Sequence, residues 1–229
     1  MTGWNGGYKM KPYRLGGYAA ILTGLSYLLI ALTFFLLPPE QRAGQVLEDS
    51  FFLSVAENPL YLKMQLLLFA LNGILAIAVV QAIFGFLNGQ KSSIRWSSTL
   101  AVVGYAILIY INFFAFEQIP KLADAYTSLD RPLRTIITAY GVGFDDWMAF
   151  LLTGLWMLVI NLHGMKEHKF PKGLAVTGMA GGAANWLIAF GSVFKSPVLM
   201  AAAAGLGGVI IGPVWFIWTG KILLAKKEG

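Results

Sequence analysis

Six long apolar stretches, each without a charged residue in its middle, run through this chain of 229 residues. A helix needs about 20 apolar residues to cross the hydrocarbon core of a bilayer. The stretches cover residues 18–37, 64–86, 99–116, 147–162, 174–194 and 198–224. With 57% hydrophobic and 12% charged residues and a mean hydropathy of +0.67, the chain is more apolar than one soluble core can bury. The sequence therefore predicts an all-α protein, a single six-helix transmembrane domain over residues 1–229.

The first apolar stretch follows three basic residues, as the apolar region of a signal peptide does. It is longer than such a region, and the sequence after it, Pro38-Pro39-Glu40, contains no small-residue cleavage site. We therefore expect the stretch to be an uncleaved first span.

Most basic residues fall on one side of the predicted bilayer. The N-terminus, the 87–98 and 163–173 loops and the C-terminus together hold eleven Lys and Arg against two Glu. The remaining connections hold six Lys and Arg against nine Asp and Glu. Because cytoplasmic loops carry the excess of Lys and Arg, the sequence predicts that both termini are cytoplasmic. The formal charge of +6 is then an orientation signal, and no nucleic-acid partner is expected.

The longer predicted extracytoplasmic connections carry helical patterning. Apolar residues recur there at helical spacing, and Asp130-Arg131-Pro132 is a typical helix start. We expect short amphipathic helices that either lie in the membrane surface or form a lid over an outward-facing cavity. The apolar positions are Ile119, Leu122, Tyr126 and Leu129, then Leu133, Ile136, Ile137 and Tyr140, and more weakly Ala43, Val46, Leu47 and Phe51.

Small residues cluster in the last two stretches. Gly178 and Gly182 are spaced as G-x-x-x-G, and so are Gly208 and Gly212, beside the run Ala201–Ala204. In lipid, small residues mark the faces where helices approach closely. Packing within the chain is the favoured interpretation, and a homodimer interface is the alternative. We also expect Pro213 to distort the last span.

Several chemistries are excluded by what the spans lack. No lysine lies in the middle of a span, so a retinal Schiff base cannot form. His163 and His168 cannot face one another across the bilayer, which excludes bis-histidine haem and leaves only a single axial ligand at His163 as an alternative. Cysteine is absent, and there is no H-E-x-x-H or G-x-S-x-G motif. No cofactor, metal or catalytic residue is expected, and no carboxylate lies at the midplane for ion coupling.

Polar residues gather instead at the predicted extracytoplasmic ends of the second, third and fourth spans. Ionisable groups at membrane depth suggest function by default, so these residues are the candidate binding site. If the helix ends meet, Lys63 pairs with Glu117 or an aspartate around a polar-headed pocket for an amphiphile. The candidates are Lys63, Gln65, Asn72, Asn112, Glu117, Asp145 and Asp146.

The same polar residues also have ordinary structural roles. Asp145 can cap a helix, Lys63 can reach the interface with a buried stem, and Asn72 and Asn112 can bridge helices. A metal-dependent enzyme based on Asp145 and Asp146 is disfavoured, because adjacent residues on a helix point about 100° apart. We expect Gln81, Asn161 and Asn185 to form hydrogen bonds between helices.

Three short segments give the chain a resemblance to a known family. They are RLGGYAAIL at 14–22, FPKGLAVTG at 170–178 and VWFIWTGK at 214–221, together with a long acidic first loop. The pattern resembles the bacterial six-span membrane proteins of domain-of-unknown-function family 4386, over nearly the whole chain. The resemblance implies a single six-helix domain in the bacterial cytoplasmic (inner) membrane, and it assigns no functional residue.

Two functions follow from these observations as expectations. The first is binding or transport of a lipid-like or amphipathic small molecule at an extracytoplasmic-side pocket, with membrane lipids as partners. The alternative is a non-catalytic accessory subunit that joins other membrane subunits through its glycine- and alanine-rich helix faces.

Overall fold

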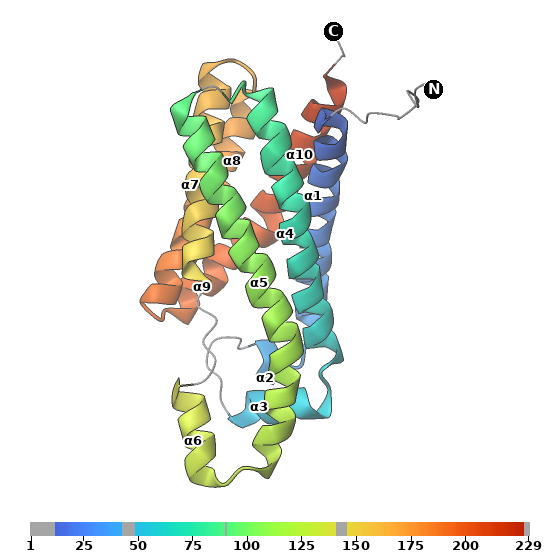
Figure 1. The fold of residues 1–229 in the computed structure, drawn as a ribbon, viewed down its shortest axis with the longest axis vertical. Coiled ribbons are helices and arrows are strands. Elements are labelled where there is room, and N and C mark those ends of the chain that lie inside the picture. The colour runs from blue at the N-terminus through green and yellow to red at the C-terminus, as the bar shows by residue number, and fades with distance from the viewer. Residues whose placement is uncertain (1–11, 43–48, 90, 141–145, 227–229) are drawn as a thin grey trace, which may run out of the picture.

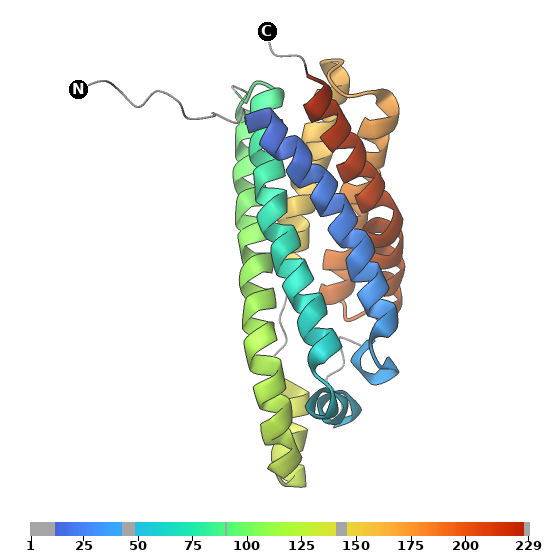
Figure 2. The same cartoon turned by 90° about the vertical axis from the view of Figure 1, so that its right-hand side faces the viewer.

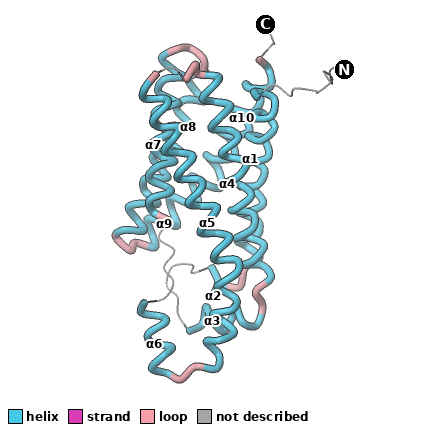
Figure 3. The backbone as a smooth tube through the Cα atoms, in the orientation of Figure 1, coloured by secondary structure: helices cyan, strands magenta, loops and turns pink. Residues whose placement is uncertain are grey.

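The computed structural model describes residues 12–42, 49–89, 91–140 and 146–226. The described part of the chain is 90% helical and contains no strand (Figure 3). The elements are α1 (Pro12–Leu36), α2 (Pro39–Arg42), α3 (Asp49–Glu57), α4 (Leu60–Phe86), α5 (Ser92–Ser128), α6 (Arg131–Tyr140), α7 (Trp147–Lys166), α8 (Lys172–Val193), α9 (Pro197–Ala204), the π-helix η1 (Gly205–Ile211) and α10 (Gly212–Ala225).

Within the described residues, six helical segments are long and apolar enough to cross a membrane, which confirms the predicted number of spans. They are α1, α4, α5, α7, α8 and the uninterrupted succession of α9, η1 and α10. The observed helices extend most predicted stretches by a few polar or charged residues at their ends.

The spans pack side by side as a bundle (Figures 1 and 2). α1 packs between α4 and α10, α5 between α4 and α7, and α8 contacts both α7 and α10. The start of α1 and the end of α10 lie at the same end of the bundle (Figure 1), here called the terminal end; the opposite end is the distal end. Trp156 and Trp215 are fully buried between the helices, whereas side chains such as Leu32 and Phe35 are exposed, as lipid-facing residues are.

Glycines allow close backbone contact between neighbouring helices. A Cβ atom on Gly182 of α8 would lie 2.8 Å from the Gly154 carbonyl oxygen of α7, and one on Gly220 of α10 would lie 2.7 Å from the Gly17 carbonyl oxygen of α1. These contacts confirm that Gly182 packs within the chain. Gly208 differs, because a Cβ there would have no neighbour within 4 Å.

The third span continues where the sequence predicted a separate amphipathic helix. α5 has 37 residues and runs through Pro120 to Ser128, so at about 1.5 Å per residue it is about 55 Å long and exceeds the hydrocarbon core. The expectation of a distinct helix through Ile119 and Leu129 was wrong. The apolar positions continue one face of the same helix, where Tyr126 is buried and stacks on Phe52 of α3 with ring centroids 4.5 Å apart.

The other two amphipathic segments are helical. α6 begins at Arg131, as predicted, and the Leu133 amide donates to the Asp130 carboxylate at its start. In the first connection α3 buries Phe51, Phe52 and Val55 against the extension of α5. α3 therefore caps the distal end by packing on protein; Ala43, Val46 and Leu47 lie outside the described residues.

We expect Gly154→Ala to weaken the fold. The new Cβ would lie 2.6 Å from Trp186 Cδ1 and 2.8 Å from the Gly182 carbonyl oxygen, and a backbone atom cannot move aside cheaply. Overpacking of this kind costs about 1–3 kcal/mol. The control is Gly85→Ala in α4, where the nearest atom, Tyr13 Cε1, is 3.5 Å away.

Thermal unfolding in detergent, followed by size-exclusion chromatography of heated samples, measures the difference. Gly154→Ala is expected to lower the midpoint by several degrees, whereas Gly85→Ala leaves it unchanged or slightly higher, since alanine suits a helix better than glycine. Equal midpoints for the two variants would contradict this account of α7–α8 packing.

Candidate functional site

The described members of the predicted polar group lie in the distal halves of α4 and α5 and directly before α7. Lys63 of α4 reaches α5, where its ammonium lies 5.7 Å from the centroid of the Phe116 ring. The adjacent Glu117 is exposed and forms an ion pair of 2.7 Å with Lys121 of its own helix. The Lys63 ammonium therefore lies over the residue next to Glu117, and the two side chains contact different partners.

The two asparagines of this group make structural hydrogen bonds. Asn72 donates to Ser26 Oγ at 2.7 Å and to the Thr23 carbonyl at 3.3 Å, which ties α4 to α1. Asn112 donates to the Leu108 carbonyl of its own helix at 2.8 Å. Gln65 is half-buried.

The aspartates predicted at the start of the fourth span are described only in part. Asp146 directly precedes α7, and its backbone carbonyl accepts from the amides of Ala149 and Phe150. Asp145 lies outside the described residues. Among the described members of this group, Lys63 and Asn72 contact a neighbouring helix, whereas Asn112 and Glu117 bond within α5. A ligand-binding role for the group stays a prediction.

Polar residues deeper in the bundle bridge helices, as two of the three predictions stated. Asn161 of α7 accepts from Trp215 Nε1 of α10 at 3.0 Å. Asn185 of α8 donates to Thr153 Oγ1 of α7 at 3.3 Å. Gln81 is exposed instead. The bridging amides are therefore part of the bundle's packing.

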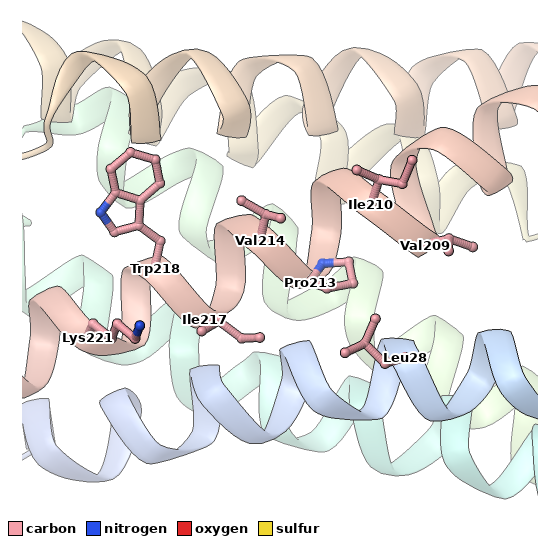
Figure 4. A pocket seen from close by; sticks show the side chains of 8 residues that line it. All are labelled: Leu28, Val209, Ile210, Pro213, Val214, Ile217, Trp218 and Lys221. Atoms are coloured by element: carbon pink, nitrogen blue, oxygen red, sulfur yellow. The ribbon is translucent and has the colours of Figure 1, made fainter.

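A groove of about 600 Å³ lies on the outer surface of the bundle, between α1 and the last span (Figure 4). Its walls are apolar except at the end nearest the terminal end, where a lysine stands. Several wall residues are substantially exposed, with Leu28 at 44%, Ile210 at 57% and Val214 at 48%, so the groove opens towards the lipid. The lining residues are Leu28, Val209, Ile210, Pro213, Val214, Ile217, Trp218 and Lys221.

The groove follows from a distortion of the last span. Pro213 has no amide hydrogen and its ring crowds the preceding turn, so a regular α-helix cannot continue through it. The chain responds with the π-helix η1, and the Gly212 amide bonds to the Gly207 carbonyl five residues earlier. The distortion predicted at Pro213 therefore takes the form of a wider helical turn, which places Val209 and Ile210 in the groove wall. π-helical turns are rare in proteins, and those that occur are often found at functional sites.

Close contact between α1 and α10 forms the base of the groove. A Cβ on Gly24 of α1 would lie 2.6 Å from Ile217 Cγ1 and 3.0 Å from the Pro213 carbonyl oxygen. Nearer the terminal end, Gly17 and Gly220 bring the two backbones together in the same way. The helices therefore touch along the base of the groove, and their side chains form its walls.

A second polar arrangement at the terminal end was not predicted. Ser93, at the start of α5, lies with its hydroxyl 3.1 Å from His163 Nε2, and His163 Nδ1 lies 3.0 Å from the Val159 carbonyl oxygen. Since that carbonyl can only accept, Nδ1 carries the hydrogen and Ser93 donates to Nε2. A hydroxyl that donates to a neutral imidazole is also the arrangement of a nucleophile and its base. Here the pair is away from the groove, and we interpret it as a tie between α5 and α7.

Glu167, the residue after α7, joins two loops at the same end. Its carboxylate oxygens lie 2.5 Å from Lys91 Nζ and 3.0 Å from Lys169 Nζ. Hydrogen bonds from Lys91 and then Lys169 lower the pKa of Glu167 from 4.5 to about 2. No sequence pattern marks this contact, because Lys91 and Glu167 are far apart in the chain.

The fold defines the class of protein. In the described part of the chain six helices are long and apolar enough to cross a membrane and expose apolar side chains on the outside, as in a multi-span α-helical membrane protein. The chain belongs to the family described as Domain of unknown function (DUF4386), whose model matches residues 22–220. The expected family is thereby confirmed. No curated protein and no solved structure matches the chain.

We expect Glu167→Gln to destabilise the protein in a pH-dependent manner. The folded pKa of Glu167 lies below its ordinary value, so the ion pairs stabilise the fold above pH 4.5, and this stability is lost as the pH falls through about 2. Above pH 4.5 the variant should unfold about 2–4 °C lower than the wild type, a loss of about 1 kcal/mol.

Thermal unfolding at pH 7, 4.5, 3 and 2 measures this effect, and the difference between the two proteins should shrink over the last three values. Glu117→Gln is the control, because the Glu117–Lys121 pair is exposed within one helix and contributes little. A difference that is independent of pH, or equal effects of the two variants at pH 7, would contradict the prediction.

Proposed function

We propose that this protein binds a lipid-like amphiphile within the membrane, in the groove between α1 and the last span. The observation that carries the proposal is the composition of the groove: it is apolar, with one cationic side chain, Lys221, at the end nearest the terminal end. An amphiphile has the same division into an apolar chain and a polar head.

The length of the groove fits one leaflet. Val209 and Lys221 are the outermost lining residues along the last span, and a helical rise of about 1.5 Å per residue places them about 18 Å apart. Half of a hydrocarbon core of about 30 Å is about 15 Å. A single acyl chain can therefore lie along the groove while its head stays at the level of Lys221.

The orientation of the protein decides which leaflet the groove faces. The first span begins and the last span ends at the terminal end. This end carries most of the basic residues of the chain, which supports cytoplasmic termini. The groove would then open in the cytoplasmic leaflet, so the proposed site moves from the predicted extracytoplasmic pocket to the opposite side of the membrane.

A reporter fused to the C-terminus tests this orientation. Green fluorescent protein fluoresces when it folds in the cytoplasm, and alkaline phosphatase is active only when exported. We expect a fluorescent fusion and an inactive phosphatase fusion. The reverse pair of results would contradict cytoplasmic termini and would move the groove to the other leaflet.

A second candidate function is that of an accessory subunit of a larger membrane complex. Ala201, Ala204, Gly205 and Gly208 are small and at least partly exposed, and neither glycine has a neighbour within 4 Å of its Cβ position. Small residues on an unpacked helix face permit close approach of another helix. In this function the chain acts by packing, and the groove is a secondary feature.

We expect Val214→Trp to reduce bound lipid. Val214 is 48% exposed in the groove wall, so the larger ring fills the groove without disturbing the interior. Displacing about two CH₂ groups of an acyl chain costs about 1.6 kcal/mol, roughly a tenfold loss of affinity. The matched control is Val103→Trp on α5, which is 45% exposed and outside the groove.

Native mass spectrometry of the purified proteins, titrated with a phospholipid, measures the bound fraction. The wild type and Val103→Trp should carry lipid, and Val214→Trp should carry about tenfold less. Equal binding by the two tryptophan variants would show unspecific surface lipid and would contradict the proposed function. A wild type that is found only in complex with another protein chain, with no lipid bound, would favour the accessory-subunit function instead.

A further inference from the structure

We propose that the groove selects an anionic glycerophospholipid and that Lys221 binds its phosphate headgroup. This inference rests on the proposed function, because it names the chemical class of the amphiphile. The occupant belongs to the leaflet on the side of the terminal end.

Lys221 stands where a headgroup would lie. It follows Gly220, whose Cβ position is 2.7 Å from the Gly17 carbonyl oxygen, so Lys221 is level with the first turns of α1. Trp218, one turn earlier, also lines the groove. Tryptophan is enriched at the headgroup layer, and lysine directs its ammonium towards it along an apolar stem. In Figure 4 Lys221 continues the row formed by Pro213 and Ile217.

The protein supplies no counter-charge for Lys221 in the part of the chain that is described. Among the described residues at the terminal end, Glu167 alone is acidic. Both of its carboxylate oxygens already bind lysines. The other described carboxylates belong to the distal end. Lys226 has aromatic partners instead, with its ammonium 4.3 Å from the Tyr13 ring centroid and 5.0 Å from that of Phe86. Lys221 is therefore a cation beside an apolar groove with its charge available to a lipid phosphate.

Neighbouring charges favour a headgroup with net negative charge. Arg14 precedes Gly17 by one turn of α1 and is exposed, so a second cation lies at the same level of the bundle. A zwitterionic headgroup carries an ammonium that these cations repel, whereas a phosphatidylglycerol headgroup carries only the phosphate charge. A lysine near an anionic lipid surface contributes about 1 kcal/mol, which is about a fivefold preference.

Native mass spectrometry with two lipids of the same acyl chains tests the inference. The full-length protein is titrated with phosphatidylglycerol and, separately, with phosphatidylethanolamine. We expect about fivefold tighter binding of phosphatidylglycerol by the wild type and by Lys221→Arg, which keeps the charge. Lys221→Gln should lose most of this preference and should retain its affinity for phosphatidylethanolamine.

Lys166→Gln is the matched control. Lys166 is exposed at the same end of the bundle, on α7, outside the groove, so its variant should keep the wild-type preference. If the wild type binds both lipids equally, or if Lys166→Gln and Lys221→Gln reduce the preference alike, the headgroup assignment is overturned.

The variants at Val214 and Val103 separate this failure from failure of the proposed function. If Val214→Trp loses lipid and Val103→Trp does not, the groove binds the acyl chain, whatever the headgroup result. If the two variants bind lipid alike, the lipid is annular only, and both the groove and its headgroup preference are rejected.

Discussion

Close backbone contact at glycines is the interaction on which this bundle depends. Lipid is as apolar as the helix surfaces, so burial of apolar area drives helix association weakly and close packing has to supply the attraction. Gly154 and Gly182 provide it between α7 and α8, and Gly17 and Gly220 between α1 and α10. The second pair also fixes the base of the groove, so the same type of contact that holds the fold together positions the candidate site.

The groove results from a conflict within the last span. The bilayer demands that backbone groups find partners inside the helix, and Pro213 removes one donor. A π-helical segment before the proline satisfies the backbone with a wider turn and carries Val209 and Ile210 into the wall beside Val214. The groove therefore has a structural origin: a local departure from the α-helix that the glycine-rich sequence permits.

The sequence predicted the features that depend on composition and on neighbouring residues. Hydropathy predicted the six spans of the described chain. Amide side chains in apolar spans correctly predicted the hydrogen bonds between helices at Asn161 and Asn185. It failed where distant segments meet. The extension of α5 packs Tyr126 against Phe52 of α3, and the contact of Ser93 with His163 joins residues 70 apart.

The groove and the predicted polar site are different features of the molecule, for a related reason. The predicted site rested on charged residues near helix ends, among them Lys63, whose contact with Phe116 of α5 could not be read from spacing. Pro213 and Gly212 were visible in the sequence as a source of distortion, but nothing there showed that α1 would form the facing wall. A proline after a glycine-rich stretch in a span is the signal that would have located the groove.

An experimental structure in phosphatidylglycerol nanodiscs tests the central claim most directly. The account predicts an elongated density along Val214 and Ile217 that ends in a headgroup within hydrogen-bonding distance of Lys221 Nζ. A groove that is filled by protein side chains, or one in which the last span is a regular α-helix through Pro213 and no lipid density lies against α1, would contradict it.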